Sequence, residues 1–361
     1  MSIKVILSEN VKPKDTMTKV NSKKRALITG VAGQDGAYLS RLLLEKGYTV
    51  FGMDRSDIEM DKGNLAFLGI DKEIQYCSFN LLDYSDICNA LNTIKPAEIY
   101  NLAGLSSVSM SFREPILTAE SNGLSTLKIL EAIRHTDPAI RFYQASSSEL
   151  FGKTDISPQN EKTPFYPRSP YASAKLFAHC STINYREAYN LFACAGIMYN
   201  HESPLRGLAF VTRKITNSMV KIKNGFQAKL YLGNLSAKRD WGYAEDYVKA
   251  MWLMLQQREP DDFVIATGKM HNIRDFVEAS ANCVGIGIEW SGAGVDEKGV
   301  NKLTGETLIE VSPEFFRPTD VDNSVGDASK AAEKLNWRTK VSFEEMVEIM
   351  VKEDIKALIG N

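Results

Sequence analysis

The chain has 361 residues, of which 44% are hydrophobic and 24% charged, and its formal net charge is −2. This length exceeds one typical domain, and the globular composition excludes a mainly disordered protein. Because the charge is nearly balanced, we expect no nucleic-acid partner. No apolar run reaches the length of a membrane helix, so we expect no membrane partner. The four histidines lack metal-site spacing, so we expect no metal.

The first 24 residues contain lysines but no long apolar stretch before a small-residue cleavage site, so residues 1–24 are expected to be the flexible leader of a cytoplasmic protein. From residue 25, short aliphatic runs alternate with amphipathic stretches. The runs predict strands at Arg25–Thr29, Tyr48–Met53, Ile74–Phe79, Glu98–Leu102, Arg141–Ala145 and Leu191–Ile197. The stretches predict helices near Tyr38–Lys46, Ser85–Ile94, Leu117–His135 and Tyr171–Tyr189. This alternation predicts an α/β fold with a Rossmann-type, doubly wound parallel sheet.

The second half of the chain is less regular. We predict a dinucleotide-binding domain over residues 25–203 and a smaller mixed α/β substrate domain over 204–361, with some of its elements returning to the sheet. Helices are predicted at Val211–Lys223, Ala244–Gln257, Ile273–Val284, Ala328–Leu335 and Phe343–Ile359. Residues 291–313 have weak periodicity and are expected to be a loop, either mobile over a site or a surface insertion. The five cysteines are far apart and form no C-x-x-C pair, so we expect reduced, mostly buried thiols.

A glycine-rich turn follows the first predicted strand. The order of strand, turn and helix predicts a dinucleotide site, where glycines let the backbone approach a pyrophosphate and the helix N-terminus attracts its charge. We assign to the cofactor site the turn residues Gly30, Gly33, Gln34, Asp35 and Gly36, and also Asn80, Leu81, Leu102 and Ala103 after the third and fourth predicted strands.

The second predicted strand is followed by Asp54 and Arg55, at the expected distance for the residue that meets the adenosine ribose. A carboxylate at Asp54 favours NAD, since it would repel the 2′-phosphate of NADP. The guanidinium of Arg55 would pair with that phosphate instead. The cofactor is therefore NAD or NADP, and Asp54 favours NAD.

The predicted strand at 141–145 leads into a loop with hydroxyls and a carboxylate, including Ser147 and Glu149. The helix beyond it carries Tyr171 and Lys175, four residues apart and hence on one face. At this spacing we expect the ammonium to lower the pKa of the phenol towards a value useful for proton transfer. The combination predicts a catalytic site of Ser147, Glu149, Tyr171 and Lys175.

From Arg25 to about Leu358 the chain resembles the extended short-chain dehydrogenases/reductases, and within them the GDP-mannose 4,6-dehydratases. The motifs that carry the resemblance are T-G-x-x-G-x-x-G, Y-x-x-x-K and the segments at residues 146–152, 200–204, 210–216, 232–242, 262–268 and 317–320. The first two mark the superfamily, whereas the longer segments point to the dehydratases.

The resemblance implies a role for each catalytic residue. Tyr171 would take the proton of the sugar 4-hydroxyl during hydride transfer to the nicotinamide, and Glu149 the C5 proton, with Ser147 orienting or relaying a proton. Lys175 would hold the nicotinamide ribose. The GDP group would be bound by Asn200, Lys214, Arg239, Arg317 and Asp320. The resemblance also implies a homodimer or homotetramer.

The chain departs from the family pattern at Leu208–Ala209, where a more polar pair is usual, and at Asp320, where Glu is typical. Residues 101–108 lack the usual Gln and His, and Asp54 is an acid in a family that mostly uses NADP. GDP-mannose is the expected substrate, with a GDP-linked N-acetylhexosamine or heptose as alternatives. The alternative functions are those of a nucleotide-sugar 4-reductase or epimerase and of a non-catalytic nucleotide-binding protein.

Overall fold

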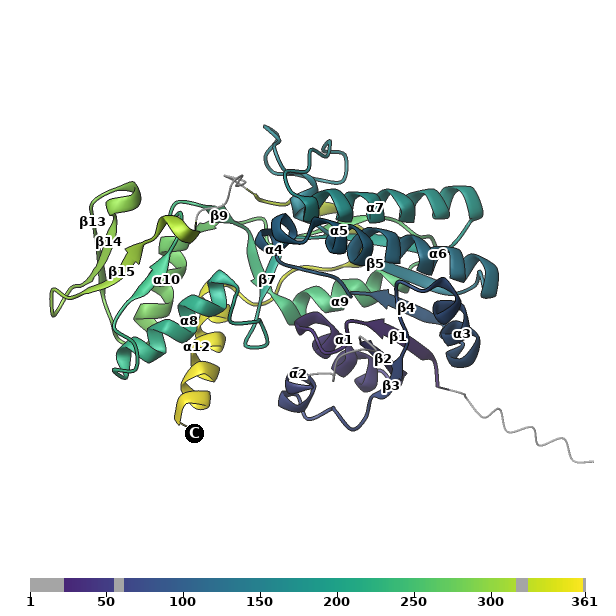
Figure 1. The fold of residues 1–361 in the computed structure, drawn as a ribbon, viewed down its shortest axis with the longest axis horizontal. Coiled ribbons are helices and arrows are strands. Elements are labelled where there is room, and N and C mark those ends of the chain that lie inside the picture. Colours follow the sequence, from purple (N-terminus) through teal and green to yellow (C-terminus); the bar gives the residue numbers. More distant parts are fainter. Residues whose placement is uncertain (1–22, 55–61, 316–323, 360–361) are drawn as a thin grey trace, which may run out of the picture.

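A seven-stranded parallel sheet forms the centre of the larger lobe (Figure 1). The computed structural model describes residues 23–54, 62–315 and 324–359. The strand order is β11-β6-β5-β4-β1-β2-β3. The strands are β1 (Arg25–Thr29), β2 (Thr49–Asp54), β3 (Gln75–Ser78), β4 (Glu98–Asn101), β5 (Arg141–Ser147), β6 (Ala193–Met198) and β11 (Phe263–Ile265). The predicted α/β fold with a Rossmann-type parallel sheet is confirmed.

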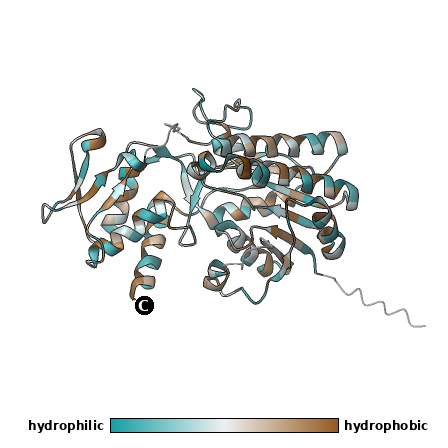
Figure 2. Ribbon diagram, viewed as in Figure 1, coloured by the Kyte–Doolittle hydropathy of each residue, from teal (hydrophilic) through white to brown (hydrophobic). Residues whose placement is uncertain are grey.

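Helices cover both faces of this sheet because successive strand residues point to opposite sides. In β1, Leu27 packs in the cluster that contains residues of α3 (Tyr84–Ile94) and α6 (Ser125–Thr136), whereas Ile28 packs in the cluster of α1 (Gln34–Glu45) and α9 (Ala244–Leu255). The α2 (Gly63–Phe67) and α11 (Ser329–Leu335) helices join the second cluster, and α7 (Pro170–Tyr189) packs on β5, β6 and α6. Brown apolar stretches alternate with polar ones along these helices (Figure 2).

One predicted helix is interrupted. Residues expected to form a single helix from Leu117 to His135 instead form α5 (Pro115–Thr118), the π-helical turn η1 (Ala119–Leu124) and α6. Proline at the first position of α5 suits a helix start, because proline has no N–H to lose there. A hydropathy pattern does not distinguish a π-turn from an α-helix, so the periodicity of this stretch did not reveal the break.

The smaller lobe packs three helices against a second sheet (Figure 1). The helices are α8 (Val211–Lys223), α10 (Ile273–Cys283) and α12 (Phe343–Ile359). The sheet has the order β13-β14-β15-β8, with β13 (Ile288–Ser291), β14 (Lys298–Asn301), β15 (Thr307–Val311) and β8 (Leu230–Leu232). The expectation of a loop at 291–313 is therefore wrong. Gly299 of β14 lies against Trp290 and Ile309, and strands this short leave little hydropathy signal.

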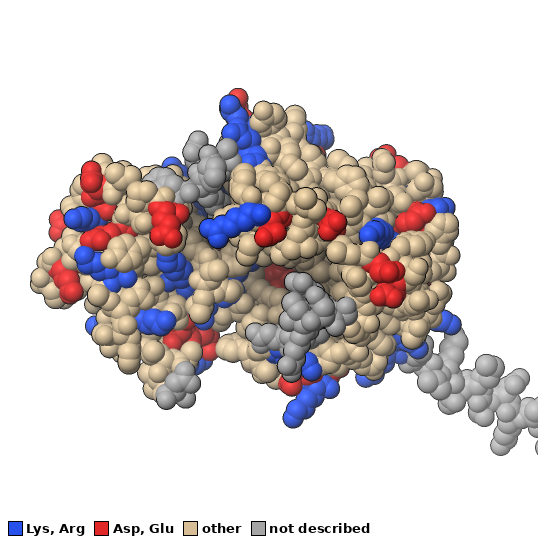
Figure 3. Space-filling model, viewed as in Figure 1, with Lys and Arg blue, Asp and Glu red and all other residues tan. Residues whose placement is uncertain are grey.

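Short strand pairs lie between the two lobes. β7 (Asn200–Glu202) pairs in parallel with β10 (Trp241–Tyr243), and β9 (Lys238–Arg239) pairs antiparallel with β12 (His271–Asn272). Acidic and basic side chains are interspersed over the face shown in Figure 3, in keeping with the balanced charge. All five cysteines are free, but only Cys194 is buried, so the expectation of mostly buried thiols is wrong.

Within the described residues no helix is long and apolar enough to cross a membrane.

Candidate active site

The glycine turn after β1 brings the chain close to β4. Gly30 has a φ of +69°, and a Cβ there would lie 2.9 Å from the backbone nitrogen of Ala103. A Cβ on Gly36 would lie 2.3 Å from the carbonyl oxygen of Gly30, so only glycine permits this contact between helix and strand. Gly33, which is exposed, begins α1 without a side-chain cap. The first N–H groups of α1 therefore suit a dinucleotide pyrophosphate.

Buried polar side chains hold the segment after β4 against this turn. The Thr29 hydroxyl accepts hydrogen bonds from the backbone nitrogens of Leu102 and Ala103, both at 3.1 Å, and donates to Asn101 Oδ1 at 2.8 Å. Asn101 Nδ2 donates to Gln144 Oε1 at 2.8 Å. Leu102 and Ala103 thus lie beside the glycine turn. Asn80 and Leu81 follow β3 at the same edge of the sheet, with the Asn80 side chain accepting a hydrogen bond from Leu82 N.

Sequence reasoning missed Asn122, which lies in the π-helical turn η1. The buried Asn122 amide accepts from Leu105 N at 2.8 Å and donates to Leu105 O at 2.9 Å. A Cβ on Gly104 would lie 2.6 Å from Asn122 Oδ1, so this segment packs tightly on the amide. Asn122 therefore fixes the chain directly after Leu102 and Ala103. The glycine at 123 was the available sequence signal of an irregular helix.

The catalytic candidates lie where β5 ends and α7 begins. Ser147 is the last residue of β5, and its hydroxyl accepts from Glu149 N at 3.2 Å. Glu149 lies in the 3-10 turn η2 (Ser148–Leu150) and is partly exposed. Ser169 caps α7, accepting from Ala172 N at 3.1 Å, and so sets the helix start that places Tyr171 and Lys175 one turn apart. The structure brings these residues to one place, since η2 packs on α7, and the Ser147 hydroxyl and the Glu149 charge both act on the pKa of Tyr171.

The expectation that the ammonium of Lys175 lowers the pKa of Tyr171 below its ordinary value is wrong. Burial raises the pKa of Tyr171 to about 12, although a hydrogen bond with Ser147 opposes the rise. Burial also lowers the pKa of Lys175 to about 8. Lys175 Nζ donates to the carbonyl oxygen of Ala145 at 3.0 Å and lies 6.0 Å from the centre of the Tyr171 ring. For the pKa of Tyr171, desolvation therefore outweighs the attraction between the phenolate and the Lys175 ammonium that the spacing suggested.

The predicted GDP-binding residues that the structure describes lie in two different parts of the protein. Asn200 in β7 pairs with Trp241, two residues after Arg239. Arg239 in β9 is buried, and its Nη1 donates to the carbonyl oxygen of Lys238 at 2.8 Å. Arg239 therefore lies two residues before the strand that pairs with the strand of Asn200.

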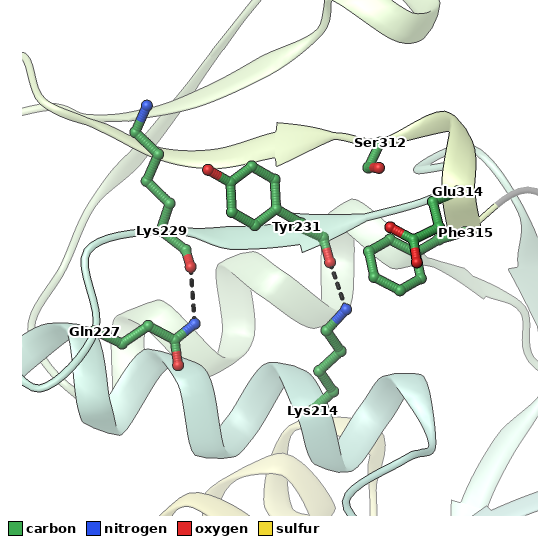
Figure 4. Close-up of a pocket in the computed structure, with 7 residues that line it drawn as sticks. All are labelled: Lys214, Gln227, Lys229, Tyr231, Ser312, Glu314 and Phe315. Atoms are coloured by element: carbon green, nitrogen blue, oxygen red, sulfur yellow. Dashed lines mark hydrogen bonds between the residues drawn. The ribbon is translucent and has the colours of Figure 1, made fainter.

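Lys214 lies in a pocket of about 380 Å³ in the smaller lobe (Figure 4). Its ammonium donates to the carbonyl oxygen of Tyr231 at 2.6 Å and lies 3.6 Å from the centre of the Phe315 ring. Burial lowers the pKa of Lys214, although Glu314 opposes this. The pocket is lined by Lys214, Gln227, Lys229, Tyr231, Ser312, Glu314 and Phe315, and hence by neither Asn200 nor Arg239.

Three predicted site residues, Arg55, Arg317 and Asp320, lie outside the described residues. Asp54 ends β2, but its side chain is also outside the description. No group of three or more His, Cys, Asp or Glu side chains that could hold a metal occurs in residues 23–54, 62–315 and 324–359.

Arg206 is a further residue that the sequence analysis did not select. Its guanidinium lies 3.6 Å from the centre of the Phe210 ring, and its Nε lies 3.2 Å from a carboxylate oxygen of Glu202. The positive charge of Arg206 acts to lower the pKa of Tyr171. Arg206 lies two residues before the unusual Leu208–Ala209 pair.

The fold matches solved nucleotide-sugar enzymes. A UDP-glucose 4-epimerase from Thermus thermophilus, in complex with NAD, has a TM-score of 0.76 at 25% identity, covering 91% of this chain and 98% of the epimerase. A dTDP-glucose 4,6-dehydratase from Streptomyces venezuelae, solved with NAD, has a TM-score of 0.77 at 20% identity, covering 92% and 98%. A short-chain dehydrogenase/reductase fold with a dinucleotide site agrees with the glycine turn described above.

Sequence comparison gives a narrower result. The family model described as GDP-mannose 4,6 dehydratase matches residues 27–350. A GDP-mannose 4,6 dehydratase of Drosophila melanogaster is 50% identical over 346 residues, covering 94% of this chain and 88% of the relative. The Homo sapiens enzyme of the same name is 48% identical over 344 residues, covering 93% and 92%. With the glycine turn, the Tyr171–Lys175 pair and Glu149 in place, these matches show that the chain belongs to the GDP-mannose 4,6-dehydratase family.

Proposed function

We propose that the protein removes water from GDP-mannose, giving the GDP-linked 4-keto-6-deoxy sugar, with a tightly bound nicotinamide cofactor. The observation that carries the proposal is Glu149 in η2, directly after β5, because η2 packs on the helix α7 that bears Tyr171. Oxidation or reduction at C4 needs only a proton-transfer group such as Tyr171, whereas loss of water across C5 and C6 also needs a base at C5. Glu149 supplies that base.

The proposed chemistry gives each of these residues a stated role. The cofactor supplies hydride acceptance and return when it is bound. Tyr171 takes the proton from the 4-hydroxyl, and the ketone formed at C4 acidifies C5. Glu149 removes the C5 proton and helps to protonate the departing 6-hydroxyl, while Ser147, whose hydroxyl acts on the pKa of Tyr171, relays or orients the proton. Lys175 binds the nicotinamide ribose, and Asn200, Arg239, Lys214, Arg317 and Asp320 bind GDP.

The choice of cofactor is a separate proposal. We propose NAD, because β2 ends at Asp54 and a carboxylate at that position would repel the 2′-phosphate of NADP. Among the structural neighbours, the Thermus thermophilus epimerase was solved with NAD and the RMD protein of Pseudomonas aeruginosa with NADPH. Release of the bound nucleotide and chromatography against both standards tests the choice, and recovery of mainly NADP would contradict it.

We also propose that the protein forms a homodimer or tetramer through the face made by α4 (Val108–Arg113), α5, η1 and α7. These elements pack together, and each exposes at least one large apolar side chain. The exposed side chains are Met110, Phe112, Ile116, Leu117, Leu124 and Phe177, and Ile116 is 75% exposed. Such a patch on a globular protein favours association. Light scattering should show that Ile116→Glu lowers the mass, whereas Ile359→Glu, at an equally exposed position on α12, should not.

The activity test follows a label through the reaction. GDP-mannose carrying deuterium at C4 should lose water and show the deuterium at C6, because the hydride stays on the bound cofactor. In Glu149→Gln the shape is kept and the base removed, so the label should remain on the nicotinamide or return to C4, with no loss of water. Glu187→Gln, at an exposed position of α7, is the matched control. Dehydration by Glu149→Gln at a near-native rate would refute the role of Glu149.

A panel of GDP-sugars, analysed by mass spectrometry for the loss of water, tests the substrate. GDP-mannose should react fastest. Turnover of GDP-N-acetylhexosamine or GDP-heptose alone would move the proposal to that sugar, and a change at C4 without loss of water would indicate a reductase or epimerase.

A further inference from the structure

An acidic side chain lies in the part of the fold that should bind a diphosphate. Asp35 is in the first turn of α1, directly after the glycine turn. The N-terminus of such a helix attracts the pyrophosphate of a dinucleotide, and a carboxylate so close to it would repel that charge. A partner that compensates the charge of Asp35 is therefore needed.

His201 provides the compensation, and its hydrogen bonds define its charge. The Nε2 atom lies 2.8 Å from Asp35 Oδ2, and the Nδ1 atom lies 2.7 Å from the carbonyl oxygen of Tyr199. Carbonyl and carboxylate oxygens only accept hydrogen bonds, so both ring nitrogens must donate. An imidazole with two N–H groups is the positively charged form.

The same residues join α1 to β7. Gln34 Nε2 donates to the carbonyl oxygen of His201 at 3.1 Å and to Asp35 Oδ1 at 3.1 Å. The Ser203 hydroxyl donates to Gln34 Oε1 at 2.8 Å, and the His201 ring stacks on Tyr247 with centres 4.7 Å apart. The first turn of α1 and the strand that bears Asn200 are thus held in one geometry by a partly buried polar network.

The surrounding charges act on the same pair. Burial would raise the pKa of Asp35, but the contacts with His201 outweigh it and lower that pKa. Burial would lower the pKa of His201, but Asp35 outweighs it and raises that pKa, while Arg206 opposes the rise. Burial sets the pKa of both Lys175 and Tyr171, and the charge of Asp35 adds a smaller upward contribution to each, so its compensation affects the catalytic pair as well.

We propose that His201 is a positioning residue that stays protonated and neutralises Asp35 beside the dinucleotide diphosphate, while fixing β7 to the first turn of α1. The proposal rests on the proposed function only in requiring a nicotinamide dinucleotide at this turn. It does not depend on which sugar reacts. Without the imidazolium, the carboxylate would face the diphosphate uncompensated.

Dinucleotide affinity of the cofactor-stripped protein tests the proposal through a double-mutant cycle. His201→Gln keeps a hydrogen-bond donor and removes the charge, so calorimetry should show roughly tenfold weaker NAD(H) or NADP(H) binding. Adding Asp35→Asn to His201→Gln removes the uncompensated carboxylate, so the double variant should regain most of the lost affinity. His135→Gln is the matched control, because His135 forms the same kind of pair with Glu131 at 2.8 Å but on the surface of α6.

Unchanged affinity in His201→Gln, or a double variant as weak as His201→Gln alone, would overturn the proposal. A lack of dinucleotide binding in the native protein would instead refute the proposed function. If His201→Gln fails to fold, nitrogen NMR of histidine-labelled native protein decides the question. Both ring nitrogens of His201 should be protonated at pH 7.5 in the native protein, and one should lose its proton in Asp35→Asn. A neutral His201 ring in the native protein would overturn the inference.

Discussion

Replacing Lys175 by methionine should stabilise the fold while it destroys activity. Lys175 is only 7% exposed, and burial lowers its pKa from the ordinary value of 10.5 to about 8. At neutral pH the folded protein therefore holds a charged ammonium in an unfavourable environment. Methionine has a similar length and no charge, so it removes this penalty.

The size of the effect follows from the two pKa values. The gap between 10.5 and about 8 corresponds to about 3 kcal/mol of lost stability in the native chain. The penalty is fully present below pH 8 and is relieved as the pH rises to 10.5, because over that range the unfolded chain binds the proton and the folded chain does not. Losing the hydrogen bond to the carbonyl oxygen of Ala145 costs about 1 kcal/mol, so Lys175→Met should gain about 2 kcal/mol at pH 7.

Urea unfolding of the cofactor-free protein between pH 7 and 10.5 provides the assay. The advantage of Lys175→Met over the native chain should shrink as the pH rises, and Lys72→Met, at an exposed position, should follow the native curve. A variant that is less stable than the native chain at pH 7, or an advantage that does not change with pH, would refute the reasoning.

Three further predictions concern binding and packing. Arg239→Ala removes a buried cation of β9 and should weaken GDP binding by about 1.5–3 kcal/mol in calorimetry with little change in melting temperature; unchanged affinity would exclude a direct contact. Gly36→Ala brings a Cβ to 2.3 Å from the carbonyl oxygen of Gly30, so urea unfolding should show a loss of about 1–3 kcal/mol, and a native-like midpoint would count against the tight contact. Asn122→Ala leaves two backbone groups of Leu105 without their partner, so dinucleotide affinity should fall by about tenfold in a fluorescence titration. Unaltered dinucleotide binding would contradict this.

The large-scale fold was accessible from sequence because its signals are local. Strands such as Arg25–Thr29 and helices such as Val211–Lys223 agree with the structure to the residue, since each is a run or amphipathic stretch long enough to show its period. The strands between residues 291 and 313 were missed because their stabilisation comes from partners across the sheet rather than from their own composition.

The candidate site was predictable in its motif residues and not in their environment. The spacing of Tyr171 and Lys175 put both on one face, but the balance between burial and attraction depends on neighbours that a spacing does not contain. Contacts such as that between Asp35 and His201 join residues 166 positions apart. His201 lies in the motif segment 200–204, but the sequence by itself does not show that Asp35 is its partner.

The place of β11 at the edge of the large sheet ties the two halves of the chain into one folding unit. β11 pairs with β6, and α9, which covers the sheet beside α1, also comes from beyond residue 203. A fragment that ended at residue 203 would leave β6 as an open edge and the apolar face under α9 exposed to water, two features that promote aggregation. On the ribosome the sheet cannot close until about three quarters of the chain has emerged, so the nascent first lobe must be protected from association until then.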